Sequence, residues 1–294
     1  MDVAEVLTLA TDGLAPLHRP IMVIALRGWF DVAQVATDAL DHMTSERIAP
    51  VVGGIEPDPF FDFTVERPNT ELDDDGNRFT RWPENELRIL RRADPALNHD
   101  LIVLSGVEPH LRYATFAECI ITVATTFAVE VVVTVGAGAE AVPHTRPPMV
   151  VGSTTNEGLA RALGLARPQY QGITGLVGVL QERLDRASIP AVSLRVGVPH
   201  YLGNAKHPQS SIALLSHLEH VLGVPTGHAG LAEEAMRWRS LHDEAVAEDQ
   251  QASAYVRMLE REYDRKAEAS LPSGDDLAAE LERFLREQRP DEDG

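Results

Sequence analysis

Side chains that could transfer protons or bind an anion follow several apolar segments of this sequence. His144 and Arg146 lie in the stretch AVPHTRPPMVVGS, a proline-rich loop between two apolar runs. Imidazole groups and carboxylates can act as acids and bases, and a guanidinium group can clamp an anion. The polar residues at such positions are Arg27, Asp31, Ser105, Glu108, His110, His144, Arg146, His200 and Tyr201. Catalysis or ligand binding by this set is one interpretation, and hydrogen bonds that hold proline-fixed loops are the other.

Short apolar runs predict the strands that must position these side chains. The runs cover residues 21–26, 48–52, 101–104, 131–135 and 192–198. Most are apolar without alternation, which is typical of strands covered on both faces. Helical patterns lie between them, over residues 32–43, 113–127, 156–163, 176–187 and 210–222. This alternation predicts an α/β fold with a largely parallel sheet flanked by helices, and the polar set would lie at the edge where such sheets bind ligands.

Two segments depart from this rhythm. Residues 55–98 are rich in turn-forming and polar residues, which predicts an antiparallel excursion at one edge of the sheet. The stretch VGAGAE (135–140) resembles the start of a dinucleotide-binding loop, but the third glycine is missing and VPH follows where a helix should begin. We therefore expect a tight turn after a strand at this position.

The last part of the chain has a different character. Residues 231–269 contain no glycine or proline and repeat apolar residues at helical spacing, which predicts one long amphipathic helix, followed by a second from about 273 to 288. We accordingly divide the chain into an α/β domain, 1–228, and a charged helical appendage, 229–294. Docking on a partner and packing on its own domain are both open for the apolar stripe. Its candidate interface residues are Trp238, Leu241, Val256, Leu259 and Tyr263.

Composition excludes several classes of function. The formal charge of -19 would repel a phosphate backbone, so neither nucleic acid nor an anionic membrane is an expected partner. The single cysteine, Cys119, cannot form an intramolecular disulfide, and no signal peptide or membrane-spanning run is evident, so we expect a cytoplasmic protein. The sequence has no P-loop and no ligand-spaced Cys or His residues, so no cofactor or metal is expected.

A series of short motifs, in order along residues 20–225, carries a family resemblance. They are GWFD (28–31), FDF (61–63) with RP (67–68), LSGVEPH (104–110), VPHTRP (142–147), YQG (170–172) and VPHY (198–201). With these motifs and its charged helical appendage, the chain resembles the proteasome assembly chaperone 2 family in its actinobacterial form. The resemblance implies a three-layer α/β sandwich with a mainly parallel sheet, like the phosphorylase and peptidyl-tRNA hydrolase folds. It also adds Asp62 and Arg67 to the candidate strand-end pocket.

The resemblance further implies a cofactor-free protein that acts by binding, as a homo-oligomer such as a trimer, with proteasome α subunits as a candidate partner. The competing hypothesis is an enzyme of unknown reaction, hydrolase-like or ligase-like, that uses the His, Arg and Glu residues of the strand ends. One departure matters, because such chaperones typically end in a hydrophobic-Tyr-any tripeptide, whereas this chain ends Glu292-Asp293-Gly294. Insertion of the C-terminus between α subunits is therefore not expected, and the stripe from Trp238 to Tyr263 becomes the first candidate surface.

Overall fold

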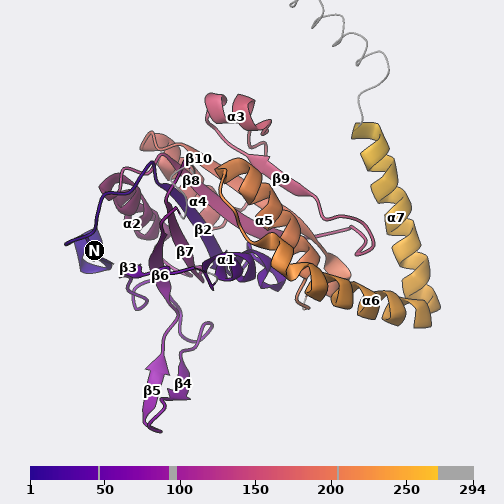
Figure 1. Ribbon diagram of the computed structural model, residues 1–294, viewed down its shortest axis with the longest axis horizontal. Helices are drawn as coiled ribbons and strands as arrows, with labels where there is room; N and C mark the ends of the chain where they lie inside the picture. The colour runs from indigo at the N-terminus through magenta and orange to yellow at the C-terminus, as the bar shows by residue number, and fades with distance from the viewer. Residues whose placement is uncertain (46, 93–97, 204, 271–294) are drawn as a thin grey trace, which may run out of the picture.

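The computed structural model describes residues 1–45, 47–92, 98–203 and 205–270 (Figure 1). Its strands are β1 (Leu7–Leu9), β2 (Ile21–Arg27), β3 (Val51–Ile55), β4 (Asn69–Leu72), β5 (Arg78–Arg81), β6 (Asn85–Leu90), β7 (Leu101–Val107), β8 (Val131–Glu140), β9 (Val150–Ser153) and β10 (Ala191–Pro199). Its α-helices are α1 (Val35–Ser45), α2 (Tyr113–Thr126), α3 (Glu157–Leu163), α4 (Leu176–Arg186), α5 (Pro208–Leu222), α6 (Ala232–Glu248) and α7 (Gln250–Ser270).

Among the described residues, eight strands form one sheet in the order β1-β3-β6-β7-β2-β8-β10-β9. The four central strands, β7, β2, β8 and β10, are parallel, and Ile21 at the start of β2 pairs with Leu101 on one side and Val131 on the other. On one flank β6 joins β7 antiparallel, and on the other β9 joins β10 antiparallel. The predicted α/β fold is confirmed, with the parallel part of the sheet at its centre.

Helices cover both faces of the sheet, which gives three layers. Along β2, Met22, Ile24 and Leu26 face one core, which is completed by α2 and α4. The alternate residues Ile21 and Val23 face a second core, which is completed by α1 and α5. Because side chains alternate along a strand, a strand that is apolar throughout can fill both cores at once. Cys119 of α2 lies fully buried in the first core, where burial raises the pKa of its thiol to about 11, so it is an inert packing residue.

The predicted turn at VGAGAE is wrong, because these residues form the second half of β8. The glycines serve close packing across the sheet face. A methyl group on Gly136 would lie 2.1 Å from a ring carbon of Phe30, and one on Gly138 would lie 2.8 Å from the guanidinium of Arg195. The two glycines therefore leave room for the side chains of Phe30 and Arg195, and the segment forms no phosphate-binding turn.

The strand predicted at 48–52 begins later, at Val51. The antiparallel excursion predicted for residues 55–98 is confirmed by β6, and the structure adds a separate hairpin, β4–β5, which projects away from the main sheet (Figure 1). Nearly every residue of this hairpin is exposed.

The single long helix predicted over 231–269 is also corrected, because the chain breaks into α6 and α7 at Asp249. Asp249 adopts an extended conformation, and its carboxylate accepts the N–H groups of Gln251 and Ala252 at 2.7 and 3.1 Å. A side chain that caps a new helix ends the previous one. The helix predicted over 273–288 and the C-terminal tripeptide lie outside the described residues. Within the part of the chain that is described, no helix has the length and apolar character needed to cross a membrane.

Candidate functional site

The polar residues predicted at the strand ends divide between two places and one helix cap. His144, Arg146, His200 and Tyr201 lie beneath α6 and α7, whereas Glu108 and His110 line an open groove on another part of the sheet edge. The lining of that groove includes Glu108 and His110 but none of His144, Arg146, His200 and Tyr201. The predicted single pocket is thus two separate sites.

His144 is buried and joins the sheet edge to α6. Its Nδ1 lies 2.7 Å from the hydroxyl of Tyr201, and its Nε2 lies 3.1 Å from a carboxylate oxygen of Asp243. The backbone N–H of His144 also donates to the Tyr201 hydroxyl, at 2.9 Å. All these contacts are satisfied when the imidazole is neutral, with the proton on Nε2 and with Nδ1 accepting from the hydroxyl of Tyr201. Burial lowers the pKa of His144 more than Asp243 raises it, in agreement with the neutral form.

Arg146 binds α7 through two carboxylates. Its Nε and Nη2 donate to the two oxygens of Asp264, each at 2.8 Å, and its Nη1 donates to Glu260 at 3.1 Å. The hydroxyl of Thr145 donates to the same Glu260 oxygen at 2.6 Å. These bonds raise the pKa of Arg146 and lower that of Asp264. Three N–H groups of this arginine are thus bound to carboxylates of α7, which makes Arg146 a docking residue for that helix.

An aromatic cluster of His144, Tyr201, His207, Trp238 and His242 fills the space between the α/β domain and α6. The ring of Trp238 stacks on His242 with centroids 4.0 Å apart and meets His207 at 4.3 Å. Burial lowers the pKa of His207 to about 4, so this ring is neutral near pH 7. The cluster is an internal contact between α6 and the domain.

The apolar stripe of the two helices is partly covered by this same chain. Val256 and Leu259 of α7 are buried, and the hydroxyl of Tyr263 donates to the carbonyl of Pro147 at 2.8 Å. His200, at the end of β10, lies 3.1 Å from the hydroxyl of Tyr255 on α7. Leu241 of α6 remains exposed. Packing on the chain's own domain, one of the two alternatives for the stripe, therefore accounts for its α7 half.

Asp31 is a helix cap. Its carboxylate accepts the backbone N–H groups of Ala36 and Thr37 at 2.7 and 3.1 Å and the hydroxyl of Thr37 at 2.6 Å. Burial raises the pKa of Asp31, while these donors lower it. Its charge satisfies the first turn of α1, so Asp31 positions the start of the helix.

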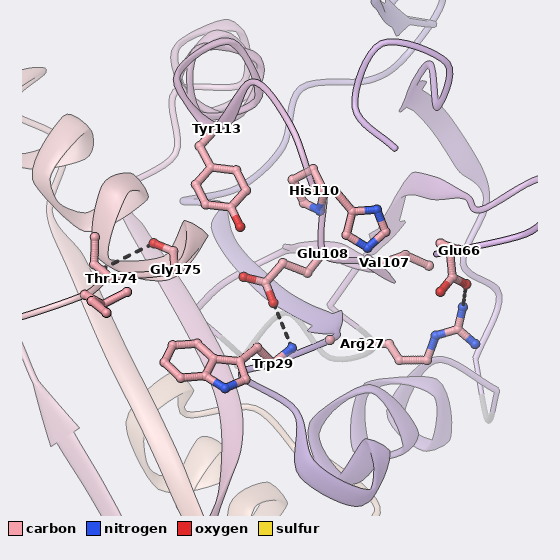
Figure 2. A pocket seen from close by; sticks show the side chains of 12 residues that line it. Arg27, Trp29, Glu66, Val107, Glu108, His110, Tyr113, Thr174 and Gly175 are labelled. Carbon is pink, nitrogen blue, oxygen red and sulfur yellow. Dashed lines mark hydrogen bonds and ion pairs between the residues drawn. The ribbon is translucent and has the colours of Figure 1, made fainter. Parts of the chain in front are cut away.

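The second site is an open groove of about 700 Å³ at the carboxyl ends of β2 and β7, with Glu108 at its base (Figure 2). Glu108 is 8% exposed. One of its oxygens accepts the N–H of Trp29 at 2.9 Å, and the other accepts the N–H of Leu176 at 3.3 Å. The carboxylate therefore ties the loop after β2 to the first residue of α4, where the positive end of the helix dipole favours it.

Aromatic and apolar side chains form the walls of this groove. The ring of Trp29 lies on one side of Glu108, and Tyr113 points its hydroxyl toward Glu108 from the start of α2 (Figure 2). Burial and the nearby charge of Glu108 raise the pKa of Tyr113. At the outer end, Arg27 is paired with Glu66, and His110 accepts the N–H of Asp62 through its Nδ1 at 3.1 Å.

Arg67 lines a neighbouring, more polar hollow at the foot of the β4–β5 hairpin. Over the described ranges, no group of three His, Cys, Asp or Glu side chains is arranged to hold a metal ion.

Sequence reasoning missed three parts of these sites. Trp29 and Tyr113 stand beside the predicted residues, and the GWFD motif contained Trp29, but an isolated aromatic residue gives no signal of exposure. The partners of Arg146 lie 114 and 118 residues further along the chain. Glu260 and Asp264 are spaced i,i+4, which places them on one face of a helix, and this spacing was the available signal.

The fold and the groove together define a three-layer α/β protein with an open, partly apolar site at the carboxyl edge of its sheet. The chain belongs to the PAC2 family, whose model matches residues 25–246. This match extends into α6, past the boundary predicted at residue 228.

Solved structures agree with this assignment. A PAC2 family protein from Streptomyces avermitilis is 36% identical, with a TM-score of 0.75 over 81% of this chain and 99% of that chain. A proteasome-assembly chaperone homologue from Mycobacterium tuberculosis is 34% identical, with a TM-score of 0.72 over 80% of this chain and 99% of its own. A Corynebacterium glutamicum protein of unknown function, 20% identical, shares the fold with a TM-score of 0.81 over 92% and 100% of the two chains. No curated protein matches this sequence.

Proposed function

We propose that this protein acts by binding other proteins, as a chaperone-like homo-oligomer, and that proteasome α subunits are among its partners. The family and the similarity to a proteasome-assembly chaperone homologue support this class of function. In this proposal the contact surface is the groove of the α/β domain, residues 1–228. Residues 229–294 are a separate helical appendage, whose described helices α6 and α7 contact the domain at the loop after β8.

The observation that carries the proposal is a set of large apolar side chains exposed at and beside the groove. Trp29 is 72% exposed, Ile173 is 86% exposed and Tyr170 is 74% exposed. Trp29 and Ile173 both line the groove, and Tyr170 reaches the carbonyl of Ile173 with its hydroxyl at 2.9 Å. Exposed aromatic groups that cluster at a hollow are typical of protein-binding surfaces, where such residues contribute most of the binding energy.

The division of the strand-end residues is the reason for proposing binding ahead of catalysis. An acid–base site needs its groups within hydrogen-bond reach of one substrate. His144 and Arg146 are instead engaged with Asp243, Glu260 and Asp264.

The proposal is tested by measuring mass and partner capture together. Light scattering on the full chain should give the mass of a homo-oligomer, and immobilised protein should retain purified proteasome α subunits. Replacing Ile173 by Glu should weaken at least one of these interactions, because it puts a charge into the exposed apolar surface. The variant Ile48→Glu is a matched control, since Ile48 is exposed away from the groove. A monomeric chain that retains no α subunit would contradict the proposal.

A further inference from the structure

Glu108 differs from the other buried carboxylates of this chain. Among the described residues, three carboxylates are buried: Asp31, Asp100 and Glu108. Asp31 accepts three hydrogen bonds, and Asp100 accepts the N–H groups of His18 and Arg92 and lies 3.5 Å from the guanidinium of Arg91. Glu108 accepts two backbone N–H groups, and none of the described ion pairs includes it. A buried carboxylate normally has a cation or a full set of donors, so Glu108 has unused acceptor capacity.

The arginine that lines the groove is already paired with another carboxylate. Arg27 lines the same groove, but its guanidinium is turned to Glu66 at the outer end (Figure 2). His110 is held with Nδ1 as an acceptor and its ring edge-on to Phe61, with ring centroids 5.8 Å apart. The negative charge at the base of the groove is therefore left for a ligand.

The walls of the groove fit one kind of cation. A guanidinium is planar, stacks on aromatic faces and donates in parallel to both oxygens of a carboxylate. Trp29 presents an exposed indole, and Tyr113 faces Glu108 from the opposite wall (Figure 2). The groove is open along one side and continues into the exposed apolar residues beside it, so it can admit a side chain that is attached to a polypeptide.

We propose that this groove binds an arginine side chain of a partner polypeptide, with its guanidinium on the carboxylate of Glu108 and against the ring of Trp29. This inference rests on the proposed protein-binding function and names the chemistry that the partner must present. The strongly negative charge of the whole chain favours the approach of such a partner.

Fluorescein-labelled peptides that differ at one position test the proposal. The sequence GSGRGSG is compared by anisotropy with the same peptide carrying lysine or citrulline in place of arginine, at 150 mM salt. We expect the arginine peptide to bind about tenfold more tightly than the citrulline peptide and a few-fold more tightly than the lysine peptide. Equal binding of the arginine and citrulline peptides, or of the arginine and lysine peptides, would overturn the assignment.

Variants of the full chain locate the site. Trp29→Ala and Glu108→Gln should each weaken binding of the arginine peptide by about tenfold. Trp29 is exposed, so its loss leaves folding intact even if Glu108→Gln proves unstable. Trp82→Leu and Glu84→Gln are controls, because both residues line the neighbouring hollow and not this groove. Unchanged binding in Trp29→Ala, or an equal loss in the two controls, would show that the site is not the groove.

The same proteins separate this inference from the function it rests on. If the chain forms oligomers or retains α subunits but no variant distinguishes the peptides, the arginine site is rejected and the protein-binding function stands. If the peptides are distinguished while the chain is monomeric and retains no α subunit, the groove binds arginine and the proposed partners are wrong.

Discussion

Arg146 and Asp264 form a pair of parallel hydrogen bonds, Nε to Oδ1 and Nη2 to Oδ2, each 2.8 Å long. The two residues are 118 positions apart in sequence and join the loop after β8 to α7. Together with Glu260 they hold α7, the last described helix, over the strand ends. The loop with the polar residues of an active site is therefore the surface on which α7 packs.

Replacing Asp264 by Asn should loosen α7 without unfolding the domain. The amide cannot accept from both nitrogens of Arg146, and the pair is partly open to solvent, so the effect is local. We expect amide hydrogen exchange over residues 250–270 to become roughly two- to fivefold faster, while exchange in α2 and β2 stays unchanged. Arg265→Met is the control, because it removes a pair within α7. Exchange that is equally fast in both variants would argue against the docking role.

His144→Ala should lower the free energy of unfolding by about 1 to 3 kcal/mol, because it removes a buried ring that bonds the hydroxyl of Tyr201 and the carboxylate of Asp243. Urea denaturation followed by circular dichroism measures this difference. His220→Ala, on the exposed face of α5, should change stability by less than about 0.5 kcal/mol. A His144→Ala protein as stable as the unaltered chain would show that the ring is dispensable for packing.

Acid should destabilise the contact between α6 and the domain. The pKa of His207 falls from about 6.5 in the unfolded chain to about 4 in the folded protein, because its ring is buried against Trp238 and close to His144 and His242. The unfolded chain therefore binds more protons between these values. The contribution of neutral His207 to the free energy of unfolding is fully present above about pH 6.5. It is lost as the pH falls toward 4, by up to about 3 kcal/mol.

The measurement is the free energy of unfolding at pH 7 and pH 4.5 for the unaltered chain and for His207→Gln. The variant should lose less stability between the two pH values, because its amide does not titrate. A decline of the same size in both proteins would assign the acid sensitivity to other groups.

A chain that ends at His228 should still unfold cooperatively. Among the described residues, neither apolar core contains a residue beyond Leu231, so this truncation takes only Leu231, a partly buried residue, from the second core and leaves the first complete. We expect a lower melting temperature, since His144 and its neighbours become exposed, but a single transition by circular dichroism. If the appendage also joins subunits, light scattering will show a smaller mass. Loss of folding would place 229–270 within the core of the domain.

Gly136→Ala should destabilise the protein by about 1 to 3 kcal/mol, because the added methyl would lie within 2.1 Å of the ring of Phe30. Thermal unfolding measures the change. Gly54→Ala in β3 is the matched control, because its methyl would meet its nearest atom at an ordinary 3.5 Å. Equal stability of the two variants would show that Phe30 can move aside.

The layered fold was largely predictable because its signals are local. Runs such as IMVIAL are apolar at every position, and only a strand between two helical layers buries both of its faces. The predicted helix over 113–127 matches α2 to within one residue, because the helical spacing of its apolar residues is a local signal. Where a local signal was ambiguous the prediction failed. At Gly136 the glycine is needed because the ring of Phe30, a residue distant in sequence, packs against it.

What the sequence by itself determined is which chemical groups stand at the ends of the strands, since strand order along the chain places them at one edge. Only the tertiary structure decided which of them are free. Arg146 is neutralised by carboxylates more than a hundred positions away, whereas Glu108, one of three buried carboxylates among the described residues, belongs to none of the described ion pairs. The physical reason is that a charge is satisfied by whatever the folded chain brings within about 4 Å, and that distance depends on the packing of whole helices, which no local pattern encodes.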